Sequence, residues 1–403
     1  MADNDYVIRV VTSPLDIDAQ AWDELLHQQA DASPFMRHAY LCALHASGCA
    51  TAETGWAPHF FTLTADGELV AACALYAKSH SYGEYVFDWA WANAYQQHGV
   101  PYYPKAVVAV PFTPVPGARL LARSAHARAA LVQALVQWCK QSGLSSLHLL
   151  FIQAADVAAS TQAGLMLRHT VQFHWNNTAP AYRDFEHFLA SLTQEKRKKI
   201  RQERRKVQEA GVTFRWALGA DITPTDWDFF YRCYERTYLE HGNAPYLNRD
   251  FFQRMADTMP QHWLLFVAER AGAPIASSLI AVSADSTMPG GQNGGEKNSG
   301  PVAYGRYWGA LERVDCLHFE ACYYQPLQWC IAHGYQRFEG GAQGEHKMAR
   351  ALLPVRTTSA HWLAHPAFAD AVARFLERED QGIDHYLEEL TERSPLRHDD
   401  QGH

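Results

Sequence analysis

The pattern of apolar and polar residues predicts strands near the start of the chain. His59–Thr64 and Glu68–Lys78 alternate between the two kinds, as strands with one buried face do. Between them stands Asp66-Gly67, a pair that favours a two-residue hairpin turn. A shorter stretch, Tyr6–Val11, predicts an earlier strand. The first part of the chain is therefore expected to contain a β-hairpin.

Helices are predicted on either side of this hairpin. Ser33-Pro34 has the residue types of a helix start, and Gly48 is placed to end that helix about four turns later. Residues 125–141 predict a second helix, with Ser124 at its start and Gly143 at its end. This mixture of elements predicts a mixed α/β fold.

Two further segments complete the first half. Residues 85–117 are rich in aromatic residues and proline and have no clear period. We expect a long, ordered connection there, which is a place where function often lies. Residues 145–152, after the second helix, predict a strand.

The same order of segments recurs in the second half of the chain. Three pairs of segments match, namely residues 34–40 with 245–251, 68–78 with 273–283, and 137–143 with 328–334. Chance similarity is the alternative, because short matches are common. The shared order and the shared setting in helices and strands favour an internal duplication of an α/β unit.

The length of 403 residues agrees with two domains. We expect a first domain over residues 1–170 and a second over 212–392. Residues 171–211 form a helical connector that includes a strongly basic helix, and residues 393–403 form a tail. The second domain carries the candidate active site, because polar and aromatic residues are densest there.

The basic helix departs from the charge balance of the chain, which has a net charge of −8. Residues 196–206 contain eight basic residues and one acid, so this segment carries +7 and the remainder −15. A charge run is usually a solvated helix face, but cations at this density repel one another unless an anion neutralises them. We expect phosphate binding by Lys198, Arg201 and Arg205, without base reading, because no recognition motif accompanies them.

Cysteine and histidine spacing argues against disulfides and zinc. No two of the eight cysteines have CxxC spacing, which is typical of a reduced, cytoplasmic protein. Cys316, His318, Glu320 and Cys322 alternate like metal ligands, but such residues at a helix start more often pack or cap, so we expect no metal. No apolar run approaches the ~20 residues of a membrane helix, and the acidic N-terminus does not read as a secretory signal.

Candidate chemistry begins with an arginine in an apolar strand. Arg306 shares one face of the predicted strand 304–309 with aromatic neighbours. Such an arginine either pairs with a buried acid, for which Glu320 and Glu339 are the nearest candidates, or reaches a ligand. The helix that follows opens at residues 317–325 and should end at Gly334. Within it, Glu320 lies one turn from Tyr324.

A second cluster follows the predicted strand 336–339. Glycines at 340, 341 and 344 let the backbone turn tightly, and an acid, a base and two cations come next. The end of a central strand is where open α/β sheets usually bind ligands. The alternative is a surface turn followed by a solvated helix.

These motifs together resemble one known family. Segments 245–247, 304–309, 317–325 and 341–350, with the basic helix upstream, are similar to the FemAB-like family of duplicated GNAT-fold proteins, which is labelled as involved in peptidoglycan biosynthesis or recognition. The likeness covers Pro34 to Glu379. It implies two tandem acyl-CoA N-acyltransferase-like (GNAT) domains of mixed α/β class.

The resemblance also implies a reaction class. Related Fem ligases move an amino acid from charged tRNA onto the peptide of a cell-wall precursor, and other GNAT proteins move an acyl group from a CoA thioester onto an amine. In both reactions an amine attacks an activated acyl carbon, which requires a base for the ammonium proton and donors for the oxyanion. The implied donor is an aminoacyl-tRNA or an acyl-CoA, with no tightly bound cofactor.

Two departures from the family pattern bear on the donor. The pyrophosphate loop of CoA-dependent GNAT proteins, Q/R-x-x-G-x-G/A, has no good copy here, because residues 208–213 follow a helix and residues 292–297 lie in a glycine-rich loop. This favours a tRNA-type donor, or a domain that binds without catalysing. Ala351 follows Arg350 where the family suggests glycine, which could stiffen the turn.

Residue types and neighbourhoods suggest roles for an acyl or aminoacyl transferase acting on an amine. The candidates for proton transfer are His346, Glu345 and Glu320, with His346 the better-matched base near neutral pH. The candidates for binding the acceptor and anionic groups are Arg306, Tyr324, Gln343, Lys347 and Arg350. The candidates for donor phosphates are Lys198, Arg201 and Arg205.

Two other functions stay open. One is a non-catalytic binder of a cell-wall peptide or an anionic metabolite on a transferase-like fold. The other is a CoA-dependent N-acetyltransferase with an unusual donor loop. The partners expected are a small-molecule or peptide acceptor and, through phosphate contacts, tRNA. A monomer is expected, because two domains in one chain can supply the pairing that other GNAT proteins obtain by dimerising.

Overall fold

The structure is a computed structural model, and it describes residues 6–283, 300–342 and 344–397. By packing, the chain divides into two compact units. Unit 1 comprises Met1–Thr170 and Arg356–Tyr386, and unit 2 comprises Val171–Val355 and Leu387–His403. These ranges differ from the predicted domains, because residues 356–386 pack with the first unit and the helical connector packs with the second.

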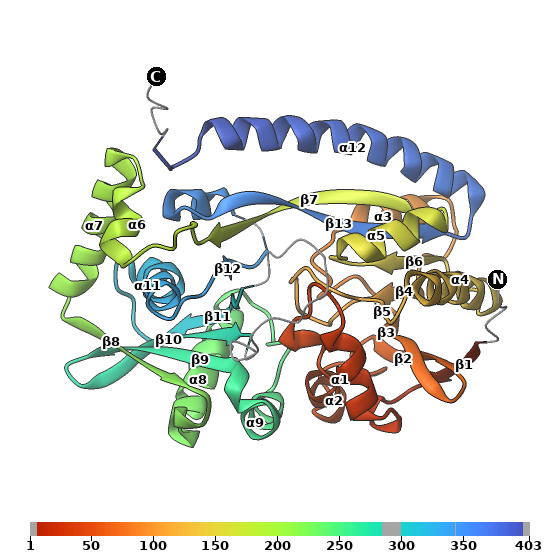
Figure 1. Cartoon of the computed structure of the whole chain (residues 1–403), viewed down its shortest axis with the longest axis horizontal. Helices are drawn as coiled ribbons and strands as arrows, with labels where there is room; N and C mark the ends of the chain where they lie inside the picture. The colour runs from red at the N-terminus through yellow and green to blue at the C-terminus, as the bar shows by residue number, and fades with distance from the viewer. Residues whose placement is uncertain (1–5, 284–299, 343, 398–403) are drawn as a thin grey trace. The chain divides into compact units, whose positions relative to one another are not determined.

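Unit 1 is a mixed sheet with helices packed on it (Figure 1). The strands are ordered β1-β2-β3-β4-β6-β13; β4 and β6 run parallel, and the other neighbours run antiparallel. The elements are β1 (Val7–Val11), α1 (Ala19–His27), α2 (His38–Ala46), β2 (Trp56–Ala65), β3 (Glu68–Lys78), α3 (Trp89–Gln97), β4 (Lys105–Val108), β5 (Leu121–Ala122), α4 (Ala125–Gln141), β6 (Ser146–Leu149), α5 (Ala154–Gln162) and the parts of β7 (Met166–Asn176), β13 (Leu353–Leu363) and α12 (Pro366–Glu392) that fall in this unit.

Local sequence signals set several boundaries in unit 1. The predicted hairpin is β2–β3, and Asp66 and Gly67 take positive φ angles of 52° and 82°, as a tight hairpin turn requires. The hydroxyl of Ser124 accepts a hydrogen bond from the backbone of Ala127 and caps α4 as predicted. The helix predicted from Ser33-Pro34 is interrupted: a 3-10 turn at Pro34–Met36 precedes α2.

The sequence predicted that the segment 85–117 is a connection, but the segment also contains regular elements. It contains α3 and the central strand β4, whose four residues are all buried. Val107 and Val108 are apolar, but Lys105 at the start of the strand is charged, so no alternation marked it. The prediction was wrong because β4 is buried on both faces, where strands lose the period-two signal.

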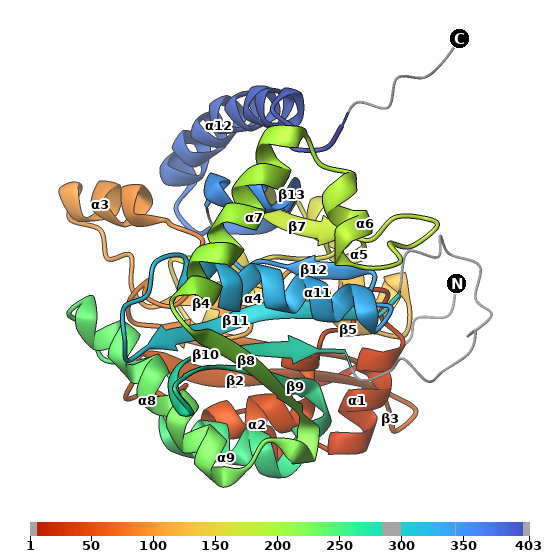
Figure 2. The same cartoon turned by 90° about the vertical axis from the view of Figure 1, so that its left-hand side faces the viewer.

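Unit 2 is built from a second mixed sheet, ordered β8-β9-β10-β11-β12-β7. Strands β11 and β12 run parallel, and the other neighbours whose register is described run antiparallel. Figure 2 shows α8 and α9 on one face of this sheet and α7 and α11 on the other. The elements are α6 (Phe185–Ala190), α7 (Gln194–Glu209), β8 (Val212–Leu218), α8 (Pro224–Glu240), α9 (Arg249–Thr258), β9 (Trp263–Arg270), β10 (Ala273–Val282), β11 (Val302–Ala310), α10 (Leu317–Phe319), a π-helical turn (Glu320–Tyr324), α11 (Gln325–Ala332), β12 (Arg337–Glu339) and a 3-10 turn (Glu345–Arg350).

The two units repeat one topology, which confirms the predicted duplication. Each has a strand, two helices, an antiparallel hairpin, a third strand, a helix and a strand parallel to the third: β1 to β6 in unit 1 and β8 to β12 in unit 2. The last strand of each copy is exchanged. His174–Asn176 of β7 pair with β12, and Ala360–Leu363 of β13 pair with β6.

The units bury apolar residues where the sequence pattern places them. In unit 1, α4 presents Ala127, Leu131 and Leu135 at one-turn spacing to a core that includes Leu75 and Leu147 of the sheet. Within the described part of the chain, no helix combines the length and apolar character needed to cross a membrane.

Candidate functional site

The candidate site of unit 2 lies where two parallel strands separate. Strands β11 and β12 pair from Val302–Arg337 to Tyr304–Glu339; β12 then ends, while β11 continues to Ala310. A pocket of about 130 Å³ opens there. Its lining includes Ser278, Arg306, Trp308, His318, Cys322, Tyr323 and Gly340. Where two strands separate, their backbone N–H and C=O groups no longer pair with each other and can form hydrogen bonds with a ligand instead.

The corresponding place in unit 1 is filled. Strands β4 and β6 pair up to Val108 and Leu149, and beyond them Gly117 donates its backbone N–H to Phe151 at 3.0 Å and bridges to Ile152. Val107, Leu150 and Phe151 join one buried apolar cluster there. This makes the separation in unit 2 the stronger candidate for a site.

The wall of the pocket is a helix with one widened turn. The helix predicted from residue 317 to Gly334 is confirmed as α10 and α11, joined by the π-helical turn Glu320–Tyr324. The hydroxyl of Ser278 on β10 donates to the carbonyl of Ala321 at 2.6 Å and ties the turn to the sheet. The π-helical turn, which the sequence did not reveal, is a feature often found at functional sites.

Two side chains meet beside the pocket. The hydroxyl of Tyr323 lies 3.3 Å from Nε2 of His346. His346 is largely exposed. The covered part of its ring is the main reason that the pKa of the imidazole lies below the usual value, and the charges of Lys347 and Arg350 lower it further. His318 is more enclosed, and burial is the main reason that its pKa falls to about 4. His346 is therefore the better base near neutral pH.

Lys347 holds the glycine loop from within. Its ammonium donates to the carbonyls of Gly341 at 3.0 Å and Ala342 at 2.9 Å, and burial lowers its pKa to about 8. Gly341 has a φ of 77°, in the region that favours glycine. A Cβ on Gly340 would lie 2.5 Å from the side chain of Leu352. The predicted tight turn is present, and the lysine closes it.

Arg350 and Tyr324 belong to a buried cluster and do not point to solvent. The guanidinium of Arg350 donates to both carboxylate oxygens of Glu203, at 3.0 and 2.9 Å, and its carbon lies 3.6 Å from the ring centre of Phe319. The hydroxyl of Tyr324 donates to Glu203 and accepts from Nε of Arg350 at 3.3 Å. These contacts favour a structural role for both residues.

Glu320 is likewise engaged. It accepts hydrogen bonds from Arg204 at 3.0 Å and from Gln325 at 2.7 Å, and its side chain is 5% exposed. Arg306 is half-buried, with its guanidinium carbon 5.0 Å from the ring centre of Tyr307, and it lines the pocket.

The remaining candidates of this cluster lie outside the pocket lining. Glu345 is exposed, and its carboxylate lies 3.6 Å from the guanidinium of Arg393. Glu339 is buried and contacts Arg337 at 3.0 Å. Gln343 falls outside the described residues.

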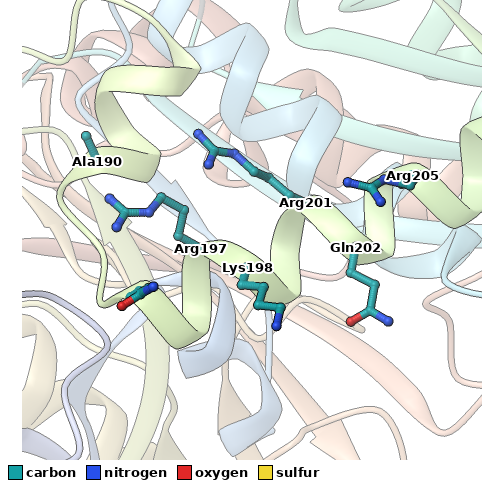
Figure 3. Close-up of a pocket in the computed structure, with 7 residues that line it drawn as sticks. Ala190, Arg197, Lys198, Arg201, Gln202 and Arg205 are labelled. Atoms are coloured by element: carbon teal, nitrogen blue, oxygen red, sulfur yellow. The ribbon is translucent and has the colours of Figure 1, made fainter.

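The basic helix α7 carries four of its cations around one exposed hollow, whereas Arg204 pairs with Glu320. Lys198, Arg201 and Arg205 line a pocket of about 700 Å³ together with Arg197 (Figure 3). The opposite face buries Ile200, Glu203 and Val207. Two of these, Ile200 and Val207, are apolar and lie two turns apart on the same face of the helix. Four cations around one hollow favour an anion there, although Arg201 also pairs with Glu186.

The chain between β11 and α10 does not form a phosphate loop. It contains Glu312 and Asp315 and no glycine. The backbone N–H groups of Leu317 and Phe319 donate to the carbonyls of Val314 and Cys316, within the turn itself. This geometry agrees with the missing pyrophosphate motif, because a phosphate cradle needs N–H groups directed at the ligand.

The described residues include the alternating set Cys316, His318, Glu320 and Cys322 and the eight cysteines. No group of three or more His, Cys, Asp or Glu side chains among them is arranged to hold a metal ion. All eight cysteines are described, and each is a thiol.

Sequence reasoning missed part of this site. Ser278 gave no signal, because only the packing of β10 against the π-helical turn brings it to the pocket. The sequence placed Tyr323 one turn from Glu320 but gave it no role. Glu203 had one: it is the single acid in the run 196–206, and a lone acid among cations is a candidate for a buried ion pair.

Comparisons with known proteins agree with this fold. A family model described as FemAB-like, peptidoglycan biosynthesis/recognition, matches residues 13–398. The crystal structure of FemX is 10% identical and covers 91% of this chain and 100% of its own, with a TM-score of 0.53. L-PGS from Bacillus licheniformis is 13% identical and covers 89% and 97%, with a TM-score of 0.50.

A tandem GNAT protein from the clavulanic acid biosynthesis pathway is 10% identical and covers 90% of this chain and 99% of its own, with a TM-score of 0.41. No curated protein sequence matches the chain. The fold class is confirmed as mixed α/β with two tandem GNAT-like domains related by duplication.

Proposed function

This chain belongs to the FemAB-like family, and we propose that it transfers an acyl or aminoacyl group to an amine. In this step the amine nitrogen attacks the carbonyl carbon of an ester or thioester, so a C–N bond forms and a C–O or C–S bond breaks. The amine loses one proton, and the leaving oxygen or sulfur gains one. The observation that most supports the proposal is the pocket where β11 and β12 separate.

The pocket suits the end of one side chain. Whole ligands usually occupy roughly 300–1,000 Å³, so about 130 Å³ accepts only the reacting end of a larger acceptor. Arg306 in the lining is the residue to bind a carboxylate or phosphate of that acceptor. We propose a cell-wall peptide or a similar small molecule as the acceptor.

His346 is the proposed proton acceptor. The hydroxyl of Tyr323, in the pocket lining, lies 3.3 Å from its Nε2, and burial raises the pKa of this phenol, so the tyrosine stays protonated. The amine can therefore give a proton to the oxygen of Tyr323 while the Tyr323 hydroxyl gives its proton to Nε2 of His346. The contacts of Glu320 with Arg204 and of Glu345 with Arg393 leave these two as weaker candidates.

The proposed donor is an aminoacyl-tRNA. Lys198, Arg201 and Arg205 form an exposed cationic face, and the N–H groups of Leu317 and Phe319 donate to carbonyls of the β11–α10 turn. Both features favour a polyanionic donor over CoA. We also propose a cytoplasmic location and a monomer.

The test is transfer of a labelled aminoacyl group from bulk charged tRNA to amine-containing cell-wall peptides. Arg306→Ala and His346→Ala should each lower the rate at least about a hundredfold, the usual scale for general acid–base groups. Arg236→Ala and His98→Ala, exposed residues of the same types elsewhere, should match the wild type. Unchanged rates in both R306A and H346A would reject the site.

One specific observation favours a second candidate, a non-catalytic binder. Arg350 and Glu320, both candidates for the reaction, are committed to buried ion pairs. Peptide binding without turnover, with acyl-CoA as well as charged tRNA, would support it. Protection against heat by CoA, followed by transfer from acetyl-CoA, would instead support an N-acetyltransferase.

A further inference from the structure

The inner face of the basic helix α7 contains one acid. Glu203 is the single acidic residue of the run 196–206, and it is 8% exposed, whereas Lys198 and Arg205 on the outer face are exposed. A buried carboxylate in such a helix needs a strong partner, because burial disfavours its charge. The helix therefore carries exposed cations on its outer face and a buried carboxylate on its inner face.

The partner of Glu203 is Arg350, at the end of the 3-10 turn Glu345–Arg350. The guanidinium donates to both carboxylate oxygens, and its other nitrogen, Nη1, donates to the backbone carbonyl of His346 at 2.8 Å. Arg350 is 3% exposed. One arginine thus joins the basic helix to the backbone of the residue proposed as proton acceptor.

Two further contacts hold this arrangement. Tyr324, from the π-helical turn, donates its hydroxyl to Glu203. The residue after Glu203, Arg204, pairs with Glu320 of the same turn at 3.0 Å. Two neighbouring residues of α7 therefore bond the first and the last residue of the π-helical turn, which forms the wall of the pocket.

We infer that Glu203 is a positioning residue, which holds the turn bearing His346 through Arg350. A catalytic effect of this positioning rests on the proposed function. The structural role of Glu203 in holding the turn does not depend on that function. Bidentate arginine–carboxylate pairs fix geometry as well as energy. Loss of the carboxylate charge would leave Arg350 without its counter-ion beside His346.

The consequence for His346 has a definite sign. The groups that face its imidazole are Tyr323, His318 and the cations Lys347 and Arg350, and the two cations already lower its pKa. Glu345, next in sequence, is exposed and pairs with Arg393. In Glu203→Gln the uncompensated Arg350 should lower the pKa of His346 further, by roughly half a unit or more.

The test compares the full-length wild type with Glu203→Gln and with Glu209→Gln, which removes an exposed acid from the same helix. NMR titration of the His346 imidazole, assigned by its loss in His346→Gln, gives the pKa. Hydrogen exchange of the amides at 347–352 reports the turn, since Lys347 and Ala351 donate within it. E203Q should show the lower pKa and about tenfold faster exchange, and E209Q should show neither. A folded E203Q with both values unchanged would overturn the inference.

A second variant covers the case in which E203Q does not fold. Tyr324→Phe removes only the hydroxyl that donates to Glu203 and accepts from Arg350. It keeps both charges, so it should speed exchange at 347–352 while leaving the pKa of His346 within error. Unchanged exchange in Y324F together with an unfolded E203Q would also reject the role.

Turnover separates this inference from the proposed function. If the transferase activity is found, E203Q should lower kcat while KM for charged tRNA stays within about twofold, because the outer cations are intact. Faster exchange without any transferase activity in the wild type would keep the positioning role and reject the function. Transferase activity in the wild type, with hydrogen exchange and the pKa of His346 unchanged in E203Q, would keep the function and reject the positioning role.

Discussion

Two histidines face each other inside unit 1. The Nδ1 atoms of His148 on β6 and His361 on β13 are 2.7 Å apart. Nε2 of His148 lies 3.2 Å from the hydroxyl of Tyr102, which donates to Asp88 at 2.6 Å. Burial lowers the pKa of His148 to about 3 and that of His361 well below its usual value, so both rings are neutral near pH 7. One Nδ1 must therefore carry the hydrogen that the other accepts.

Replacing His148 by glutamine should make unit 1 less sensitive to acid. The pKa of an unfolded histidine is about 6.5, above the folded value, so the stability that neutral His148 contributes is present above pH 6.5 and is lost as the pH falls from there toward 3. At pH 5 this loss is about 2 kcal/mol. Urea unfolding near pH 7.5 and near pH 5 should show the full loss in the wild type and in His98→Gln, an exposed control, and a loss smaller by about this amount in H148Q, which keeps the buried His361. An equal loss in H148Q would contradict the assignment.

A pair of glycines offers a second test on the residue scale. A Cβ on Gly309 of β11 would lie 1.8 Å from the carbonyl oxygen of Cys233 on α8, and backbone cannot give way cheaply. Gly309→Ala should destabilise unit 2 by about 1–3 kcal/mol or more. Gly382→Ala, in α12 with no atom near its Cβ, should instead stabilise by up to about 1 kcal/mol. Thermal unfolding of both variants checks this, and a G309A variant as stable as the wild type would show that β11 and α8 can move apart.

Among the elements, α7 has two faces with different tasks. Its exposed cations line the larger pocket, and its buried residues Ile200, Glu203 and Val207 attach it to unit 2. The sequence pattern predicted the cationic face. Because the inner ion pairs hold the helix, its outer cations are presented in a fixed row along one face.

Removing the outer cations should weaken tRNA binding and its dependence on salt. A Lys198→Ala, Arg201→Ala, Arg205→Ala variant should lower the slope of log affinity against log salt by about 2–3, because each lost phosphate contact lowers it by roughly 0.7–0.9. The measurement is anisotropy of labelled bulk tRNA between ~50 and ~200 mM salt. The control removes three exposed cations of the same unit, Arg232, Arg236 and Arg313. Equal slopes in the two triple variants would leave α7 as a solvated face.

On the scale of the whole molecule, the exchange of final strands decides how the chain is divided. Residues Ala360–Leu363 of β13 complete the sheet of unit 1, although they follow the second copy in sequence. The predicted boundary at residue 170 separates β6 from this partner. The repeated segments nevertheless identify the two copies, because only the last strand of each copy packs in the other unit's sheet.

Residues 1–170 alone should therefore not fold cooperatively. Without β13, strand β6 becomes an open edge, and His148 loses its contact with His361. The same segment joined by a flexible linker to residues 354–392 should recover a single cooperative transition, measured by circular dichroism on heating. A sharp transition in 1–170 alone would favour the simple tandem boundary.

What the sequence by itself determined is local. The hairpin at Asp66-Gly67, the cap at Ser124 and the basic helix follow from residue preferences within a few positions, and the duplicated segments identified a tandem fold. The family motifs also led to the neighbourhood of the site, through Arg306 and His346.

Only the tertiary structure decided which of those residues meet. Arg350 and Glu320 had the composition of a ligand site, but Glu203 and Arg204, more than a hundred positions away, take them into ion pairs. Strand β4 and the exchanged strand β13 carry no local signal for their partners. Pairing over such separations depends on the whole packing arrangement, because one strand edge or one buried charge accepts many partners that the sequence pattern alone cannot distinguish.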